Sequence, residues 1–156
     1  MRRKIMDRRG FTLAETLMVI VILSLMTAAG IAGISSVMTS RRVMVQAADA
    51  DILGSTAFQA IANELRFGQN IEVEEDCVTL DSVTYGERAR ICLTENRLTY
   101  GDEGRPILSE STYSSGLELS ELGFEENSDG SITIILTVSN GSGDLWHKEL
   151  PVVPLN

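Results

Sequence analysis

Apolar residues dominate the start of the chain in one long, uninterrupted run. Residues 11–40 contain a single charged residue, Glu15, and residues 16–40 contain none. A helix of 25 such residues is about 38 Å long, whereas the hydrocarbon layer of a bilayer is about 30 Å thick. The apolar core of an ordinary signal peptide has only about 7–15 residues. The pattern therefore predicts a membrane-spanning helix rather than a secretory signal peptide.

From residue 41 onward the apolar residues recur every three or four positions, which is the spacing of one helix face. The members of this first stripe are Val43, Ala47, Ala50, Gly54, Phe58, Ile61 and Leu65. Gly68 is a natural helix stop, and no proline precedes Pro106. We expect an amphipathic helix whose first stripe covers a small domain. A second stripe of Val45, Ala48 and Ile52 either contacts neighbouring chains or has no role.

After Gly68 the spacing changes to the alternation that is typical of strands. The expected strands cover residues 71–74, 78–84, 88–94, 97–100, 117–125, 132–138 and 145–152. Turn signals separate them, and Asp129-Gly130 predicts a hairpin. The predicted fold class is α+β. A long N-terminal helix, with a transmembrane half and an amphipathic half, packs on a small head made of an antiparallel β-meander.

Charge divides the chain into a basic start and an acidic remainder. Residues 1–10 carry five basic residues and one acidic residue, and the other 146 residues carry 8 basic and 21 acidic ones. Basic residues beside a span resist translocation, so we expect a single-pass protein with its N-terminus inside. The acidic body repels phosphate backbones, and direct nucleic-acid binding is not expected. A local basic face would be the exception, formed by Arg88, Arg90, Arg97 and Arg105.

The residues that usually carry catalysis or bind metals are sparse. Cys77 and Cys92 are the only cysteines, and outside the cytoplasm we expect them to form a disulfide; the alternative is two buried thiols. His147 is the only histidine, so neither a catalytic triad nor a zinc site can be assembled. The acidic run of Glu72, Glu74, Glu75 and Asp76 lacks the spacing of a calcium loop and predicts a solvated rim. We expect no enzyme activity, metal or cofactor.

One junction in the sequence is more specific than any membrane anchor requires. It reads RRGFTLAE over residues 8–15, so that a short basic leader ends in Gly10 and Phe11-Thr12-Leu13 follows. Glu15 stands four residues after Phe11, and about twenty apolar residues come next. This order resembles the processing site of type IV prepilins and type II secretion pseudopilins. The resemblance covers residues 9–25 and says little about residues 68–156.

The resemblance implies how the chain is processed and divided. Prepilin peptidase would cut between Gly10 and Phe11, and Phe11 would become the N-methylated first residue. Residues 1–10 would be the leader that is removed, and residues 11–40 the transmembrane and filament-core helix. Residues 41–67 would continue as an amphipathic helix into the extracytoplasmic head, residues 68–156.

Glu15 has two possible roles. Thr12 and Glu15 have capping-box spacing, so the carboxylate could simply cap the helix. Alternatively, it could pair with the Phe11 α-ammonium of a neighbouring subunit and fix the register of assembly. Breaking such a pair inside apolar surroundings costs about 3–5 kcal/mol, because an unpaired charge remains. We favour the assembly role.

The function that follows is that of a structural subunit of a type IV pilus-like filament. Its partners would be prepilin peptidase, other pilin subunits and, indirectly, the assembly platform and ATPase. It would reside in the inner membrane and then in an extracytoplasmic filament or at the cell surface. Residues 98–100, the Pro106 turn and residues 117–124 loosely resemble minor pseudopilin heads, which favours a minor pilin or pseudopilin. The alternatives are a single-pass protein displaying a β-rich binding module and a competence pilus subunit for DNA uptake.

Overall fold

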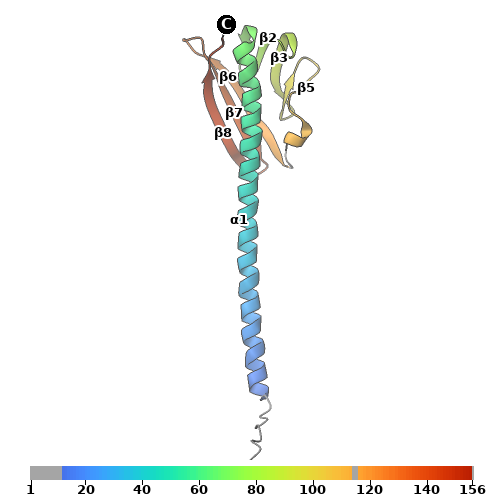
Figure 1. Cartoon of the computed structure of the whole chain (residues 1–156), viewed down its shortest axis with the longest axis vertical. Helices are drawn as coiled ribbons and strands as arrows, with labels where there is room; N and C mark the ends of the chain where they lie inside the picture. The colour runs from blue at the N-terminus through green and yellow to red at the C-terminus, as the bar shows by residue number, and fades with distance from the viewer. Residues whose placement is uncertain (1–11, 114–115, 156) are drawn as a thin grey trace, which may run out of the picture. The chain divides into compact units, whose positions relative to one another are not determined.

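The computed structural model describes residues 12–113 and 116–155 and shows one long helix followed by eight strands (Figure 1). The helix, α1, is Leu13–Phe67. The strands are β1 (Gln69–Val73), β2 (Cys77–Ser82), β3 (Gly86–Thr94), β4 (Arg97–Tyr100), β5 (Arg105–Pro106), β6 (Leu117–Glu126), β7 (Ile132–Asn140) and β8 (Gly143–Val152), with a short 3-10 helix at Glu110–Thr112. The chain divides into two compact units between Val43 and Met44. The predicted α+β class is confirmed.

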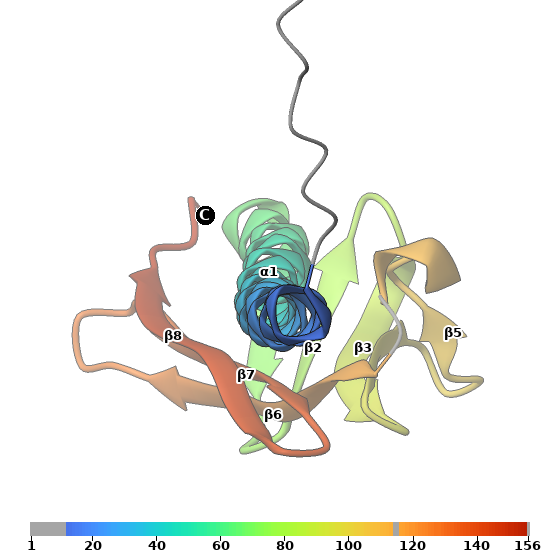
Figure 2. The ribbon, with the colours of Figure 1, turned by 90° about the horizontal axis from the view of Figure 1, so that it is seen from below.

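The strands form two antiparallel sheets rather than the single meander that the sequence predicts. One sheet has the order β1-β2-β3-β4-β5 and the other β6-β7-β8, and Figure 2 shows them side by side. Strand β6 joins them at two turns of the first sheet. The backbone N–H of Leu119 donates to the carbonyl of Asn96 at 3.2 Å, and that of Phe124 donates to the carbonyl of Glu75 at 3.1 Å. These bonds lie between loops and a strand, so alternation of side chains gives no sign of them.

The core of the second unit lies between α1 and the inner faces of both sheets. The buried helix residues are Ala50, Leu53, Gly54, Ala57, Phe58, Ile61, Ala62 and Leu65. They pack with buried strand residues such as Leu80, Ile91 and Leu136. The predicted first stripe is therefore correct from Ala50 onward. It is wrong for Val43 and Ala47, which are exposed because the strands cover α1 only from about Asp49.

Trp146 of β8 fixes the position of α1 on the second sheet. Its indole N–H donates to Asp51 Oδ1 at 3.0 Å, and its ring lies against Gly54. A Cβ atom at Gly54 would come within 2.4 Å of the Trp146 ring, so only glycine leaves room for this contact. One turn further along the helix, Lys148 Nζ lies 5.2 Å from the centre of the Phe58 ring. The inner face of β8 is thus bound to α1 by aromatic contacts.

The end of α1 is fixed by its glycine and by the C-terminal tail. The backbone N–H of Gly68 donates to the carbonyl of Glu64 at 2.7 Å, and a side chain at Gly68 would collide with this carbonyl and with Leu80. The N–H of Leu155 donates to the carbonyl of Arg66 at 3.0 Å and so satisfies one of the last carbonyls of the helix. The C-terminal tail therefore contacts the end of α1.

Cys77 and Cys92 form a disulfide, as the sequence predicts. They are directly opposite one another in β2 and β3, with their Cα atoms 4.6 Å apart. The bond joins the first residue of β2 to the middle of the five-stranded sheet, close to the turn that receives β6.

Candidate assembly site on the N-terminal helix

The helix begins with a capping box made by Thr12 and Glu15. The backbone N–H and the hydroxyl of Thr12 both donate to Glu15 Oε2 at 3.0 Å, and the N–H of Glu15 donates to Thr12 Oγ1 at 3.3 Å. Such reciprocal bonds satisfy donors that a helix start leaves without partners. The structure therefore shows the capping geometry, and it uses only one of the two carboxylate oxygens of Glu15. Pairing of Glu15 with a second subunit stays a prediction.

Gly10 and Phe11, the predicted cleavage and methylation residues, lie outside the described residues. Thr12, the first described residue, is also the first that the capping box uses.

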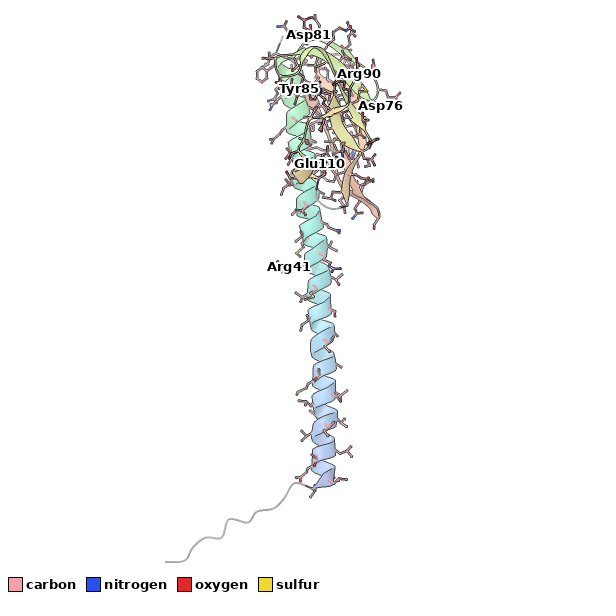
Figure 3. All side chains as sticks on the ribbon, turned by 90° about the vertical axis from the view of Figure 1, so that its right-hand side faces the viewer. Arg41, Asp76, Asp81, Tyr85, Arg90 and Glu110 are labelled. Carbon is pink, nitrogen blue, oxygen red and sulfur yellow. A yellow bond between two sulfur atoms is a disulfide. The ribbon has the colours of Figure 1, made fainter. Side chains whose placement is uncertain are left out.

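The first two thirds of α1 are exposed around the whole circumference of the helix. Every residue from Thr12 to Ala48 is exposed, and Figure 3 shows side chains projecting around this part of the helix. The exposed residues include large apolar ones such as Ile20, Leu23 and Met26, each of which has more than three fifths of its surface accessible. A water-soluble domain rarely exposes so large an apolar surface, and one of this size marks a membrane or protein contact. The helix is long and apolar enough to span a membrane.

Most of the hydroxyl groups in this segment bond to carbonyls of the helix itself. Each of five serine and threonine side chains donates to a carbonyl three or four residues earlier, at 2.7–3.0 Å. These residues are Thr16, Ser24, Thr27, Ser35 and Thr39. Unpaired polar groups are costly in hydrocarbon, so these bonds make the segment compatible with lipid or with an apolar protein interior. The sequence analysis did not anticipate them.

A shallow apolar groove lies along the same segment of α1. Ala29, Gly30 and Gly33 form its floor, and Ile34, Val37 and Met38 lie beside them. No atom lies within 4 Å of the position where a Cβ would stand at either glycine, and α1 stays helical through both. Small residues on a membrane helix allow the backbone of a second helix to approach closely. The surface that is apolar enough for a bilayer is therefore also shaped for helix packing.

Each of the four arginines of the predicted basic face lies near a carboxylate, Arg88 more loosely than the others. Arg88, Arg90, Arg97 and Arg105 lie 3.7, 2.6, 2.8 and 2.7 Å from the carboxylates of Glu72, Glu74, Glu110 and Glu103, respectively. These pairs also account for two members of the acidic run, Glu72 and Glu74. Among the described residues, no group of three or more His, Cys, Asp or Glu side chains is placed to hold a metal ion. This surface does not form an uncompensated basic patch for nucleic acid.

His147 lies on β8, next to Trp146, and faces the opposite side of the sheet. Its Nδ1 is 2.8 Å from the hydroxyl of Thr137, and its Nε2 is 3.1 Å from Glu149 Oε1. Thr137 also donates to Glu121 at 2.7 Å. The histidine thus belongs to a hydrogen-bonded row across three strands.

Comparison with known proteins yields one match, at the N-terminus. Residues 5–31 match the family model described as the prokaryotic N-terminal methylation motif. No curated protein and no solved structure gives a significant match to the chain. The matched residues contain the RRGFTLAE junction and the first part of α1, in which every described residue is exposed.

A long exposed N-terminal helix, antiparallel sheets packed on its second half and this motif together define a class of protein. The chain is a type IV pilin-like protein that carries the N-terminal methylation motif of the type IV pilin and pseudopilin family.

Proposed function

We propose that this protein is a structural subunit, a minor pilin or pseudopilin, of a type IV pilus-like filament. The observation that carries the proposal is the methylation motif at residues 5–31, followed by a helix that is exposed from Thr12 to Ala48. The motif supplies a processing signal, and the exposed helix supplies the surface that assembly would bury. Prepilin peptidase and other pilin subunits are the expected partners, with the assembly platform and ATPase acting indirectly.

In this proposal the apolar surface of the N-terminal helix first contacts lipid and later contacts neighbouring subunits. The precursor spans the inner membrane once through residues 11–40, with its basic leader on the cytoplasmic side, because lysine and arginine resist translocation. Cleavage after Gly10 removes a net charge of +4, given by five basic residues and one acidic residue. The helix then exchanges lipid for the helices of neighbouring subunits, and the acidic head stays outside.

Glu15 would guide this exchange. Its Oε1 makes no hydrogen bond among the described residues, so the carboxylate can keep its capping bonds and still accept a bond from the α-ammonium of Phe11 in a neighbouring subunit. A charged pair of this kind, formed in apolar surroundings, favours one register over others because every other register leaves a charge unpaired.

The proposal is tested by blocking the cleavage. We expect Gly10→Val to leave the protein in the membrane fraction at its precursor size, and to abolish its release in filaments sheared from the cell surface. The matched control is Gly141→Ala, since this exposed glycine lies between β7 and β8, away from α1, and a Cβ there meets nothing within 4 Å. The proposal fails if the Gly10 variant enters sheared filaments as wild type does, or if the wild-type protein is absent from them in a cell that assembles pili.

A further inference from the structure

The head contains an open pocket that the assembly role does not use. It has a volume of about 390 Å³ and lies between the β2–β3 turn and the β4–β5 turn. Its lining includes two tyrosines, Tyr85 and Tyr100, and several charged side chains. Its volume lies within the range of small-ligand sites, and more than half of its lining residues are charged.

The two tyrosine rings form the apolar part of the pocket. Their centres are 4.2 Å apart and their planes are inclined by 31°. Both side chains are half-buried, and burial, together with the nearby Glu64 carboxylate, raises the pKa of Tyr85 above its usual value. The Tyr85 hydroxyl is protonated at neutral pH, as in any tyrosine, and can donate a hydrogen bond. Rings this close cover each other's facing sides, so a ligand would pack on the outer side of the pair.

Arg88 is held at the pocket by an unusual backbone conformation. Its φ is +50°, in the left-handed region that side chains other than glycine and asparagine rarely adopt. Asp81 maintains it, because the backbone N–H of Arg88 donates to Asp81 Oδ1 at 2.7 Å and Asn70 donates to the other oxygen at 2.6 Å. Figure 3 shows Asp81 and Tyr85 toward the same end of the head. The guanidinium of Arg88 has only a loose partner, Glu72, at 3.7 Å.

The charges in the pocket are mixed. Three carboxylates, those of Glu87, Asp102 and Glu103, stand beside two guanidinium groups. The Arg105 guanidinium makes two bonds to Glu103 Oε2, at 3.0 and 2.7 Å, and Arg88 pairs with Glu72, so an anion would meet guanidinium groups that already face glutamates. The described residues show no cluster suited to a metal ion. A neutral ligand with many hydroxyl groups can bond to the guanidinium and to the carboxylate groups alike.

We propose that this pocket binds a neutral saccharide, with a sugar ring packed on Tyr85 and Tyr100. The apolar C–H face of the ring would lie on the aromatic surface. The planar groups of Arg88, Glu87 and Asp102 would bind hydroxyls, since adjacent hydroxyls offer both donors and acceptors to such groups. The pocket is open, so it fits one or two residues of a longer glycan as well as a free disaccharide. This binding is independent of the assembly role.

The test uses the full chain in a detergent without a sugar headgroup, with cellobiose, maltose and chitobiose as probes. We expect saturable binding of at least one disaccharide in the millimolar range by isothermal titration calorimetry or saturation-transfer NMR. Tyr85→Ala should weaken it at least tenfold. Arg88→Gly should do the same, and glycine keeps the backbone at φ +50° without strain. Arg97→Ala, which removes an arginine outside the pocket that pairs with Glu110, should bind as wild type does.

Three results would overturn the proposal. The first is no saturable binding of any of these disaccharides to the wild-type chain. The second is equal binding by wild type and by Arg88→Gly, the variant least able to disturb the fold. The third is binding of spermidine, used as a cationic probe, with no binding of the sugars.

Discussion

Residues 13–48 and residues 49–67 of α1 are both rich in apolar side chains, but only the second stretch buries any of them. Within the second stretch only one face of the helix is buried. Ile52 is 58% exposed, whereas its neighbour Leu53 is fully buried. In the head, burial decides which face of the helix is apolar. From Leu13 to Ala48 the whole circumference is exposed, and none of the described residues covers it. The apolar residues of the first stretch are therefore explained by surroundings outside the chain, and those of the second by the core.

The largest effect is expected from Glu15, the one charge in residues 11–40. Glu15→Ala should leave cleavage intact and reduce incorporation into filaments at least a hundredfold, because an α-ammonium left unpaired in apolar surroundings costs about 3–5 kcal/mol. The measurement is the amount of protein in sheared filaments against the amount processed. Thr12→Val is the control, because it removes the side-chain half of the capping box and keeps the carboxylate. Equal losses in the two variants would mean that Glu15 acts only as a cap.

The contrast between adjacent helix residues is tested by Leu53→Ala and Ile52→Ala. We expect Leu53→Ala to lower the free energy of unfolding by about 2–5 kcal/mol, because it leaves a cavity in the core. Ile52→Ala should change it by about 0.5 kcal/mol or less, since that side chain is largely exposed. Denaturant unfolding followed by circular dichroism gives both values. A large loss at Ile52 would show that the second stripe packs inside the chain.

The disulfide should stabilise the head by an intermediate amount. The two cysteines are 15 residues apart in sequence, and a loop of that length predicts about 3 kcal/mol by the chain-entropy model. The double variant with Cys77→Ser and Cys92→Ser should lose that much in chemical denaturation. Reduction of the wild-type protein should give the same loss and should not add to it in the double variant. A stability that does not change on reduction would contradict this account.

The smallest expected effect is on the melting temperature at acidic pH. The pKa of Asp81 is lowered, first by the backbone N–H of Arg88 and then by the amide of Asn70. A lowered folded-state pKa means that this stabilisation is complete above the usual aspartate pKa of about 3.9, and is lost as the pH falls through the lowered value. The melting temperature of wild type should therefore fall about 1–3 °C further between pH 6 and pH 2 than that of Asp81→Asn. Asp144→Asn, at an exposed aspartate whose side chain has no hydrogen-bond partner among the described residues, should behave as wild type does.

The parts of the fold that follow from spacing were predictable. A period of 3 or 4 with a following glycine predicted the end of α1 at Phe67, and alternation predicted seven of the eight strands. Strand β5 was not predicted because its two residues, Arg105 and Pro106, are too few to show alternation. The split into two sheets was not predicted, and neither were the backbone bonds from β6 to Asn96 and Glu75 that join them. Alternation of side chains gives no sign of these bonds.

The two candidate sites also differ in whether the sequence alone could reveal them. The methylation motif is a contiguous string and could be read directly, whereas the pocket at Tyr85 and Tyr100 joins two turns that are separated in sequence. The strained Arg88 has no sequence signal, because its conformation is imposed by Asp81 from the neighbouring strand. The exposure of Val43 and Ala47 was missed for a related reason, since a stripe shows which face is apolar and not how far the head extends along it.

The most direct test of the central claim is the intact mass of the protein purified from the membranes of its own host. The account predicts a chain that begins at Phe11 and carries one added methyl group, because the proposed function requires cleavage after Gly10 and methylation of the new N-terminus. A chain that still begins at Met1, in a host whose prepilin peptidase is active on its other pilins, would contradict it. A single-pass membrane protein displaying a β-rich binding module would then be the better description.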